Sequence, residues 1–152
     1  MTPVNAKIEP CTGKDLADLQ IYPTRSTDRE QVIRLYKEAG WWAPGNDRQS
    51  EFVDKIAANS YCFMGAFCRQ RMIGMGRALS DGVSDAYIQD VTVLRDYRGR
   101  GIGGMIIEQL VRKLRADRVA WIGLIGEPGT EYFYKKLGFT KMEGSVPFIY
   151  KG

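Results

Sequence analysis

Glycines and arginines that could bind a phosphate gather in one short stretch near residue 100. Four glycines fall within six residues, and two arginines accompany them. The first turn of a helix exposes unpaired N–H groups and a partial positive charge, and glycines let an anion approach these groups closely. Arginine adds fixed positive charge at the same place. The stretch therefore predicts a diphosphate site, whose candidate residues are Arg98, Gly99, Arg100, Gly101, Ile102, Gly103 and Gly104.

The glycine-rich stretch can also be compared with two other phosphate-binding motifs and with a simple turn. Gly99, Gly101 and Gly104 satisfy the G-x-G-x-x-G pattern of dinucleotide-binding folds, and Glu127 lies about 20 residues further on. In that motif the strand runs directly into the first glycine, whereas residues 95–98 intervene here, and too few residues follow for a doubly wound sheet. A Walker A loop is excluded, because no Gly-Lys-Ser/Thr follows. The glycines could also simply turn the chain.

Side chains that bind metals or act as bases at neutral pH are scarce. The chain has no histidine, which removes the commonest general base and the commonest metal ligand. Three cysteines, Cys11, Cys62 and Cys68, show no Cys-x-x-Cys spacing, so we expect neither a disulfide framework nor a metal site. Acid–base chemistry must then use carboxylates, tyrosines, lysines, cysteines or ordered water.

Length and composition predict one globular domain over residues 1–152. Hydrophobic residues make up 44% and charged residues 26% of the chain, as in globular proteins. No apolar run reaches the roughly 20 residues of a membrane helix, and Met1–Pro10 lacks a signal-peptide stretch, so we expect a cytoplasmic protein without a membrane partner. The net charge of +4 could suit a nucleic acid, but acidic residues are interleaved with basic ones, so we expect no nucleic-acid partner.

Apolar periodicity and turn residues predict the elements around the glycine-rich stretch. Residues 27–30 form a capping-box pattern that starts a helix, and Gly40 ends it. Arg69 and Gln70 form a tight turn between two strand-like runs, which predicts a hairpin. Further helices are expected over 52–57, 101–115 and 130–137, and strands over 19–22, 61–68, 72–79, 86–94, 119–125 (buried) and from 139 onward, including 148–150.

Two signatures in the chain resemble those of the GCN5-related N-acetyltransferase (GNAT) superfamily. Arg98-x-x-Gly101-x-Gly103 resembles its Gln/Arg-x-x-Gly-x-Gly/Ala motif, between a hydrophobic strand and a long helix. Residues 133–139, Phe-Tyr-Lys-Lys-Leu-Gly-Phe, are similar to its Phe-Tyr-x-Lys-Leu-Gly-Phe segment, and the order of elements agrees over nearly the whole chain. The resemblance implies an α/β (α+β) GNAT fold, in which a mixed, mostly antiparallel sheet of about six to seven strands is flanked by about four helices, with a splay between strands 86–94 and 119–125.

The resemblance also implies transfer of an acetyl group from acetyl-CoA to an amine, by direct attack in a ternary complex. Backbone groups of Val91, Thr92 and Val93 are expected to pair with the pantetheine arm, and the turn amides to hold the pyrophosphate. Tyr134 matches the tyrosine that protonates the departing thiolate in many members, and a phenol with a pKa of about 10 suits that role. Alternatively Tyr134 is a core aromatic with a satisfied hydroxyl, and Tyr132 should point elsewhere on the helix.

The group that removes the amine proton is the least defined part of the expected site. Residues 87–90, Tyr-Ile-Gln-Asp, resemble the Tyr-Leu-Glu-Asp of polyamine-type members, with Gln89 in place of the basic glutamate. Glutamine can hold a water but cannot accept that proton, so we expect a water relay near Tyr87 and Gln89. Asp90 could bind the substrate ammonium, act as base through water, or accept backbone N–H bonds. Strict alternation places Asp90 on the face opposite Gln89 and Val91, unless a bulge intervenes.

Trp41 and Trp42 lie in the loop between the first two expected helices, which walls the acceptor pocket in this superfamily. They could line a pocket for an amine, since an ammonium rests favourably on an indole face, or one of them could anchor the loop in the core. Two other classes of function stay open: a non-catalytic acyl-CoA sensor or partner-binding domain, and a nucleic-acid module. The amine, small molecule or peptide, the length of the acyl group and the oligomeric state, with a homodimer as one option, are not determined by these residues.

Overall fold

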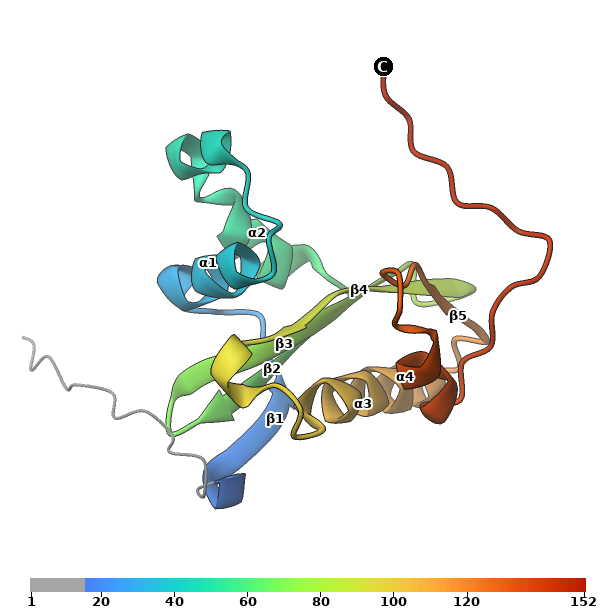
Figure 1. Cartoon of the computed structure of the whole chain (residues 1–152), viewed down its shortest axis with the longest axis horizontal. Coiled ribbons are helices and arrows are strands. Elements are labelled where there is room, and N and C mark those ends of the chain that lie inside the picture. Colours follow the sequence, from blue (N-terminus) through green and yellow to red (C-terminus); the bar gives the residue numbers. More distant parts are fainter. Residues whose placement is uncertain (1–15) are drawn as a thin grey trace, which may run out of the picture.

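The computed structural model describes residues 16–152 of the chain (Figure 1). Met1–Pro10, the stretch examined for a signal peptide, lies outside the described residues. Strands β1 to β5 span Leu19–Pro23, Cys62–Cys68, Arg71–Ser80, Asp85–Val93 and Trp121–Leu124, and helices α1 to α4 span Arg29–Glu38, Phe52–Asn59, Ile102–Ala116 and Glu131–Lys136. Short 3-10 helices cover Leu16–Asp18, Pro44–Gln49 and Arg95–Tyr97.

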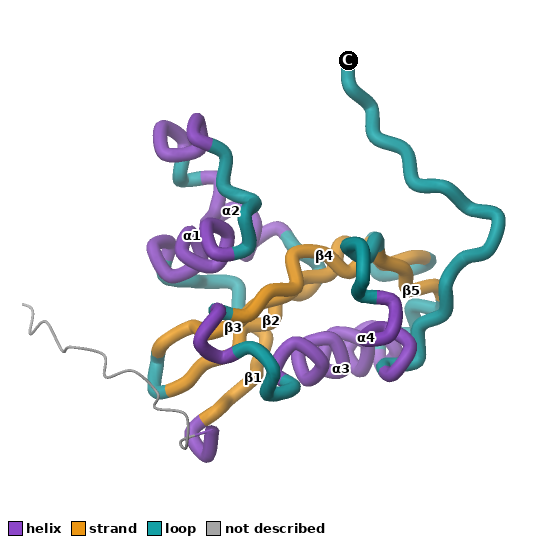
Figure 2. The backbone as a smooth tube through the Cα atoms, viewed as in Figure 1, coloured by secondary structure: helices purple, strands orange, loops and turns teal. Residues whose placement is uncertain are grey.

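The strands form one mixed sheet in the order β1-β2-β3-β4-β5. Neighbouring strands are antiparallel except β4 and β5, which are parallel and are connected through α3. The predicted hairpin is β2 and β3, whose turn residues Arg69 and Gln70 both have positive φ, 49° and 71°. Helices α1 and α2 cover one face of the sheet, and α3 covers the other with α4 beside it (Figure 2). The expected α/β architecture with a mostly antiparallel sheet is confirmed.

Helix α3 supplies the most regular part of the core, as its apolar periodicity predicts. Ile106, Leu110 and Leu114 are fully buried, each with an exposed fraction of 0%. Glycines on β3 let this helix approach closely, since a Cβ on Gly76 would lie 2.8 Å from Ile106 Cγ2. Each fully buried side chain of this size contributes roughly 1.5–3 kcal/mol. The packing therefore fixes α3 against the strands that precede the glycine-rich turn.

The start of α1 differs from the capping box that the sequence predicts. The N-cap is Asp28 rather than Thr27, and Asp28 Oδ1 accepts from the N–H of Gln31 at 3.1 Å. Gln31 Oε1 in turn accepts from the N–H of Met72 at 2.5 Å, which ties α1 to β3. A side-chain oxygen at Asp28 satisfies a free N–H of the first turn, so the cap serves the expected purpose through a neighbouring residue.

Strand β5 is shorter and more exposed than the sequence predicts. The expected buried strand over 119–125 forms only over Trp121–Leu124, in which Gly123 alone is buried. Trp121 is 38% exposed and Ile125, just beyond the strand, is 74% exposed. The reason is position: among residues 16–152, β5 pairs with β4 alone and so lies at the edge of the sheet.

The predicted return to strand after Phe139 is wrong. No strand forms over 139–152, so the sheet built by residues 16–152 has five strands rather than about six to seven. Phe148, Ile149 and Tyr150, expected in that strand, are 94%, 80% and 93% exposed. Figure 1 shows the segment, in red, leaving the domain after α4 and running away from the sheet. Because no neighbouring strand pairs its backbone groups, a strand-prone sequence stays an extended coil here.

The expectation for the cysteines also needs a correction, because Cys68 is disulfide-bonded. Cys-x-x-Cys spacing indicates metal or redox sites, but its absence does not exclude a single disulfide. Cys62 is a free, buried thiol, and burial raises its pKa. Within residues 16–152, no three or more cysteines and acidic residues gather as a metal site would require. None of the helices in that range has the length and apolarity to cross a membrane.

Candidate active site

Strand β4 contains a bulge at the point where the expected catalytic residues lie. Its pairing with β3 shifts there, so that Asp90 and Val91 together face Gly76. Asp90 has a φ of 53°, in the left-handed region that residues other than glycine rarely adopt. Because a bulge kinks the strand and re-aims side chains, the strict alternation of faces ends at Gln89.

The bulge brings Gln89 and Asp90 to the same face of the sheet. Arg77 contacts both, since its Nε donates to Asp90 Oδ2 at 2.6 Å and its Nη2 donates to Gln89 Oε1 at 3.4 Å. A Cβ added to Gly76 would lie close both to Val91 Cγ2 and to a side-chain atom of α3. Val91 therefore points to the other face of the sheet, the one that α3 covers. Asp90 therefore faces α1, as the alternative with a bulge predicts.

A buried tyrosine of α1 completes the contacts of Asp90. Tyr36 Oη donates to Asp90 Oδ2 at 2.7 Å, and Tyr36 is only 7% exposed. Burial, and then the negative charge of Asp90, raise the pKa of Tyr36 well above its usual range. The side chains of Arg77 and Asp90 are 16% and 22% exposed, so their ion pair is largely shielded from water. Asp90 could have bound the substrate ammonium, acted as a base through water, or accepted structural hydrogen bonds, and these contacts favour the last role. The donors are side chains rather than the expected backbone N–H groups.

Sequence reasoning missed two members of this cluster, Tyr36 and Arg77. Tyr36 fits the buried stripe of α1, so its hydroxyl gives no separate signal. Arg77 stands inside β3 among glycine, methionine, alanine and leucine, where a charge requires a partner. That mismatch, together with the carboxylate of Asp90 in the next strand, is a signal from which the ion pair could have been predicted.

The residues expected to remove the amine proton are open to water on this face. Tyr87 is 46% exposed, and the centre of its ring lies 5.1 Å from that of Trp121 on β5. Gln89 is also exposed, two residues along the strand. Tyr87, Gln89 and Asp90 thus share one face, with only Asp90 engaged in an ion pair.

Strands β4 and β5 separate halfway along, which confirms the expected splay. Their pairing ends at Ile88 and Leu124. The later half of β4, including residues 91–93, has no strand partner on the β5 side among residues 16–152. Backbone groups on an open strand edge can pair with an extended ligand, as in added-strand recognition. The separation therefore leaves a strand edge with which an extended ligand could pair.

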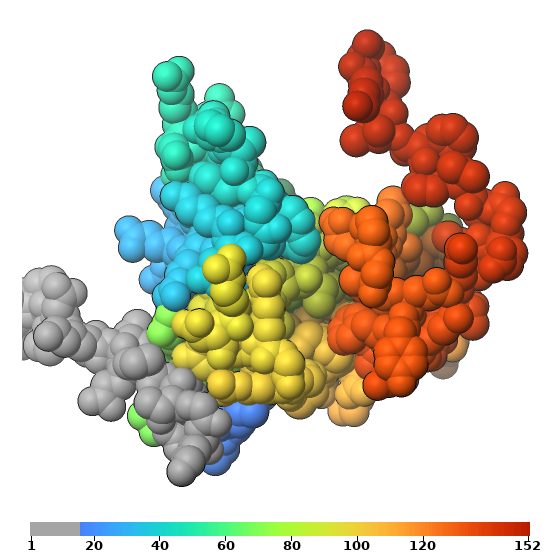
Figure 3. Space-filling view, viewed as in Figure 1, coloured from blue at the N-terminus to red at the C-terminus, as the bar shows by residue number. Residues whose placement is uncertain are grey.

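The glycine-rich turn leaves the N-terminus of α3 open. Gly99 and Gly101 have φ values of 75° and 79°, and a Cβ on either would meet no atom within 4 Å. Gly101 is the N-cap of α3, with no side-chain cap and no acidic residue in the first turn. The first N–H groups and the partial positive charge of this helix are therefore available to an anion. Figure 3 shows the turn, in yellow, on the visible surface of the domain.

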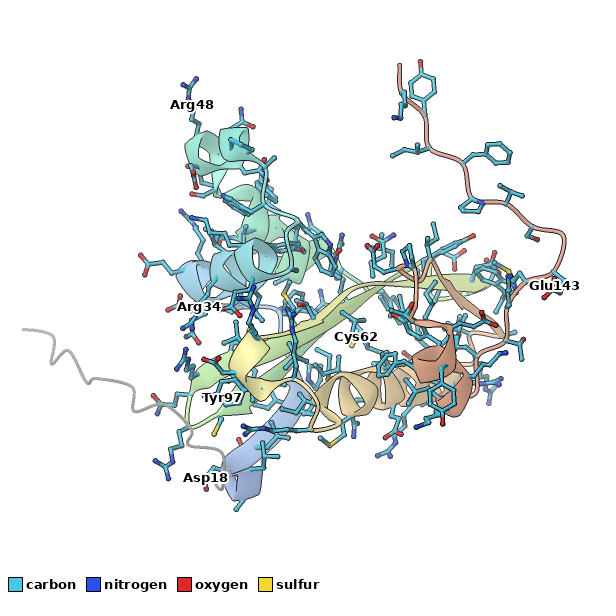
Figure 4. All side chains as sticks on the ribbon, in the orientation of Figure 1. Asp18, Arg34, Arg48, Cys62, Tyr97 and Glu143 are labelled. Atoms are coloured by element: carbon cyan, nitrogen blue, oxygen red, sulfur yellow. The ribbon has the colours of Figure 1, made fainter. Side chains whose placement is uncertain are left out.

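The two arginines of the turn make different contacts. Arg98 Nε donates to the carbonyl oxygen of Val93 at 2.8 Å, which fastens the turn to the end of β4. The Arg100 guanidinium lies 5.7 Å from the centre of the Tyr97 ring, a cation–π contact. Tyr97 is buried, and Figure 4 labels it just before α3. Both arginines thus stabilise the shape of the turn in addition to supplying positive charge.

Tyr134 lies half-buried on α4 with a hydroxyl that bonds to no other residue of the described range. Its ring contacts those of Phe133 and Phe139, at centroid distances of 5.0 and 5.9 Å. Burial, and then the charge of Glu127, raise the pKa of Tyr134, so the phenol stays protonated at neutral pH. This disfavours the interpretation as a core aromatic with a satisfied hydroxyl. Tyr132 is 70% exposed and packs with a lysine at the surface, as expected.

Helix α4 lies against the beginning of α3. A Cβ on Gly103 would lie 3.6 Å from Phe133 Cζ, and one on Gly104 would lie 3.5 Å from Leu137 Cδ2. Phe133 precedes Tyr134 directly, so the open helix N-terminus and Tyr134 belong to adjacent elements. The structure therefore brings together the two signatures that are about 30 residues apart in the chain.

The two tryptophans after α1 have different surroundings. Trp42 stacks on Phe52 with ring centroids 5.6 Å apart, and its Nε1 donates to Asp47 Oδ1 at 3.0 Å. It anchors the loop, as one of the two interpretations predicts. Trp41 is 39% exposed and lies edge-on to Tyr36, at a centroid distance of 6.3 Å. Trp41 is therefore the tryptophan that remains available to an acceptor.

One surface pocket among the described residues lies away from these side chains. It encloses about 760 Å³ near the start of α1, and residues 25–30, Asp54 and Ala58 line it. None of the residues predicted to bind a cofactor or an acceptor belongs to its lining. A pocket at that place bears little on the predicted site, because an extended ligand with a diphosphate needs an open strand edge and free N–H groups.

Known protein sequences show which family this chain belongs to. The sequence pattern of the acetyltransferase (GNAT) family matches residues 27–139. The chain is 42% identical over 135 residues to an uncharacterized N-acetyltransferase ycf52 of Pyropia yezoensis, which covers 86% of the chain and 75% of that protein. It is 41% identical over 70 residues to the chloroplastic serotonin N-acetyltransferase 2 of Oryza sativa subsp. japonica, covering 46% of the chain. The chain spans only 35% of that rice protein, and 41% of the ycf52 protein of Porphyra purpurea.

Solved structures share the fold. A probable acetyltransferase from methicillin-resistant Staphylococcus aureus superposes with a TM-score of 0.73 at 25% identity, covering 88% of this chain and 98% of that one. AAC(6')-Iy, solved in complex with the bisubstrate analog CoA-S-monomethyl-acetylneamine, gives a TM-score of 0.70 at 16% identity, covering 88% and 99%. At 16% identity, the second likeness bears on the fold alone.

Proposed function

Since this chain belongs to the acetyltransferase (GNAT) family, we propose that it transfers an acetyl group from acetyl-CoA to a primary amine, small molecule or peptide. The observation that carries the proposal is one juxtaposition. The open N-terminus of α3, whose first turn has no acidic residue, comes one short turn after the edge of β4 that β5 leaves unpaired. A diphosphate and an extended arm need these two features side by side.

The residues around this juxtaposition fit CoA. The N–H groups of the first turn of α3 would hold the pyrophosphate, and Gly99 and Gly101 leave room for it because they carry no side chain. Arg98 and Arg100 would add positive charge. The open backbone of residues 91–93 would pair with the pantetheine arm, although Arg98 already occupies the carbonyl of Val93. Bound acetyl-CoA supplies the activated thioester carbonyl and the leaving thiolate.

Tyr134 is the proposed general acid. Its hydroxyl is protonated at neutral pH and makes no hydrogen bond to another described residue, so it is able to donate to a developing thiolate. Helix α4 lies against the first turn of α3, which would hold the phosphate end of the same ligand. The acid and the phosphate site thus come from one packed unit.

Proton removal from the amine is proposed to run through water near Tyr87 and Gln89. Both side chains are exposed on one face, and neither can serve as a carboxylate base. Asp90 is paired with Arg77 and accepts from Tyr36, so we assign it to holding the bulge rather than to proton transfer. Gln89→Ala should lower kcat and leave acetyl-CoA affinity unchanged, and an unaltered kcat would exclude the relay.

Aromatic side chains favour an aromatic amine among the acceptors. Trp41, Tyr87 and Trp121 are 39%, 46% and 38% exposed on elements that border the site. An ammonium or an aromatic ring packs well against such surfaces. Serotonin, the substrate in the name of the rice relative, is the first acceptor to try. That relative is chloroplastic, so the expected cytoplasmic location remains a proposal.

The melting temperature with acetyl-CoA tests the cofactor half of the proposal. A ligand at about 100 times its Kd stabilises by about 2.7 kcal/mol, which raises the melting temperature of a domain this size by about 5–10 °C. No shift at saturating acetyl-CoA would overturn the proposal. A rise in melting temperature without transfer to any amine would instead favour the acyl-CoA sensor. That alternative is supported by Gln89, which stands where a basic carboxylate would otherwise be expected.

A further inference from the structure

Helix α1 ends in an acidic residue, Glu38, although the partial negative charge at a helix C-terminus disfavours a carboxylate. Two donors compensate for this position. The backbone N–H of Arg95 donates to Glu38 Oε2 at 2.8 Å, and Arg34 Nε donates to Glu38 Oε1 at 3.3 Å. The bond from Arg95, more than the contact with Arg34, lowers the pKa of Glu38, so the carboxylate is charged at neutral pH.

Arg95 is the residue at which the chain passes from β4 into the glycine-rich turn. It begins the 3-10 helix Arg95–Tyr97, whose N-cap residue, Leu94, makes no side-chain hydrogen bond. Glu38 accepts from the first N–H of that helix across 57 residues of sequence, which is the service that an N-cap side chain ordinarily gives. The end of α1 therefore lies against the start of the turn, which Figure 1 shows in yellow.

Helix α1 holds the segment between Asp90 and Arg95 at both of its ends. Tyr36 donates to Asp90 at the bulge, and Glu38, two residues further along α1, accepts from Arg95. Between these contacts lie residues 91–93, whose pairing with β3 resumes only after the bulge and which have no partner on the β5 side within the described chain. The position of this strand edge therefore depends on α1 as well as on β3.

We propose that Glu38 is a positioning residue for acetyl-CoA, and that it fixes the strand edge of residues 91–93 relative to the open N-terminus of α3. The inference rests on the proposed function, which assigns both features to this one ligand. Acetyl-CoA would span them, with its pantetheine arm along the edge and its diphosphate at the helix. A ligand gains affinity when the groups that bind it are already in place, and a misplacement of about 1 Å can cost roughly 100-fold in rate.

The contact of Glu38 bears on where the turn lies rather than on its local shape. The bond of Arg98 Nε to the carbonyl oxygen of Val93 joins residues of one short segment, so it keeps the shape of that segment. Two hydrogen bonds connect the start of the turn to other elements. The N–H of Leu94 donates to the carbonyl oxygen of Ile73 on β3 at 2.8 Å, and the N–H of the next residue donates to Glu38. Loss of the Glu38 contact should therefore displace the turn without unfolding it.

Two substitutions of Glu38 separate the reach of its side chain from its charge. Glu38→Gln keeps an acceptor oxygen at the same distance from the backbone, so the Kd for acetyl-CoA should rise by no more than about threefold. Glu38→Asp keeps the charge but is one methylene group shorter, so the bond to Arg95 is lost and the Kd should rise by about tenfold. Calorimetry with acetyl-CoA measures both values.

Arg34→Ala is the matched control for these variants. It removes the other donor to the same carboxylate and leaves the bond between Arg95 and Glu38 in place. Its Kd for acetyl-CoA should therefore equal that of the wild type. Thermal unfolding without ligand should show that all three variants are folded.

Hydrogen exchange at the amide of Arg95 tests the contact without any ligand. This N–H is hydrogen-bonded in the wild type, so its exchange measured by NMR should be about tenfold faster in Glu38→Asp and little changed in Glu38→Gln.

An unchanged Kd or an unchanged exchange rate in Glu38→Asp would overturn the proposal. So would equal losses of affinity in Glu38→Asp and Glu38→Gln, or a loss of the same size in Arg34→Ala. A wild-type chain that does not bind acetyl-CoA would overturn the proposed function together with this inference. Failure of the inference alone leaves wild-type binding intact, so the two failures are distinguishable.

Discussion

Tyr36 Oη donates a hydrogen bond of 2.7 Å to Asp90 Oδ2, joining α1 to the bulge of β4 across 54 residues of sequence. Arg77 Nε donates to the same oxygen at 2.6 Å. The positive charge of Arg77 therefore balances the carboxylate charge of Asp90. These contacts also hold Asp90 at a φ of 53°, which most residues avoid. Tyr36 also contacts the ring of Trp41, so the same cluster connects the bulge to the loop that follows α1.

Two substitutions of Asp90 should distinguish what its side-chain contacts contribute to stability from what its positive-φ backbone costs. Asp90→Ala leaves Arg77 without its counter-charge and puts a residue that disfavours positive φ at the bulge, so it should lower the free energy of unfolding by about 2–3 kcal/mol. Asp90→Asn, which tolerates positive φ and still accepts hydrogen bonds, should lower it by less. Urea unfolding measures both. Equal losses for the two variants would mean that the cluster does not hold the bulge.

The stability of the protein in alkali should depend on Tyr36. The pKa of Tyr36 is raised above the ordinary 10.0, so its contribution to stability is fully present below pH 10 and is lost as the pH rises toward its folded value. One such group adds a slope of about 1.4 kcal/mol per pH unit above pH 10. Unfolding free energies from pH 8 to 11 should therefore fall less steeply for Tyr36→Phe than for wild type, and parallel curves would refute the assignment.

A matched pair of glycines tests the phosphate site. Gly101 and Gly40 both have a φ of 79°, and a Cβ on either would meet no atom within 4 Å. Alanine at either position should therefore lower stability by a similar roughly 1–2 kcal/mol. Only Gly101→Ala should also weaken acetyl-CoA binding, by at least about tenfold in calorimetry, because its methyl group would point where the pyrophosphate approaches. Equal affinity in the two variants would remove the turn from the cofactor site.

The parts of the fold that were predictable are those with a local signal. The stripe of α3, the hairpin turn at Arg69 and Gln70, and the positive φ at Gly99 and Gly101 follow from residue types at fixed spacing. The signature around Tyr134 placed the candidate acid on a helix, and the structure brings that helix against α3. Local chemistry and resemblance sufficed for these elements.

The features that sequence reasoning missed depend on partners distant in the chain. The cluster of Asp90 needs α1, β3 and β4 together, and the pairing of Arg77 with Asp90 appears only once the bulge fixes which face each side chain occupies. The stretch Phe148 to Tyr150 has strand propensity, but a strand requires a neighbour, and the described chain offers it none.

Two tyrosines on α4 provide a test of the acid with an internal control. Tyr134→Phe should reduce kcat by about 100-fold or more, because a positioned general acid typically contributes that much, and should leave the Kd for acetyl-CoA unchanged. Tyr132→Phe, at a position 70% exposed on the same helix, should change neither constant. Steady-state kinetics with calorimetry measures both. Equal kcat values for the two variants would exclude Tyr134 as the acid.

Acetyl transfer itself is tested most directly by measuring free thiol and N-acetylated product together. The purified chain is incubated with acetyl-CoA and a panel of amines that includes serotonin, polyamines and lysine-containing peptides, with thiol followed by absorbance and product by mass spectrometry. We predict that at least one amine yields one N-acetyl product for each thiol released, well above the release without amine. Binding of acetyl-CoA with no product from any amine would contradict the proposed function and leave a CoA-binding domain without catalysis.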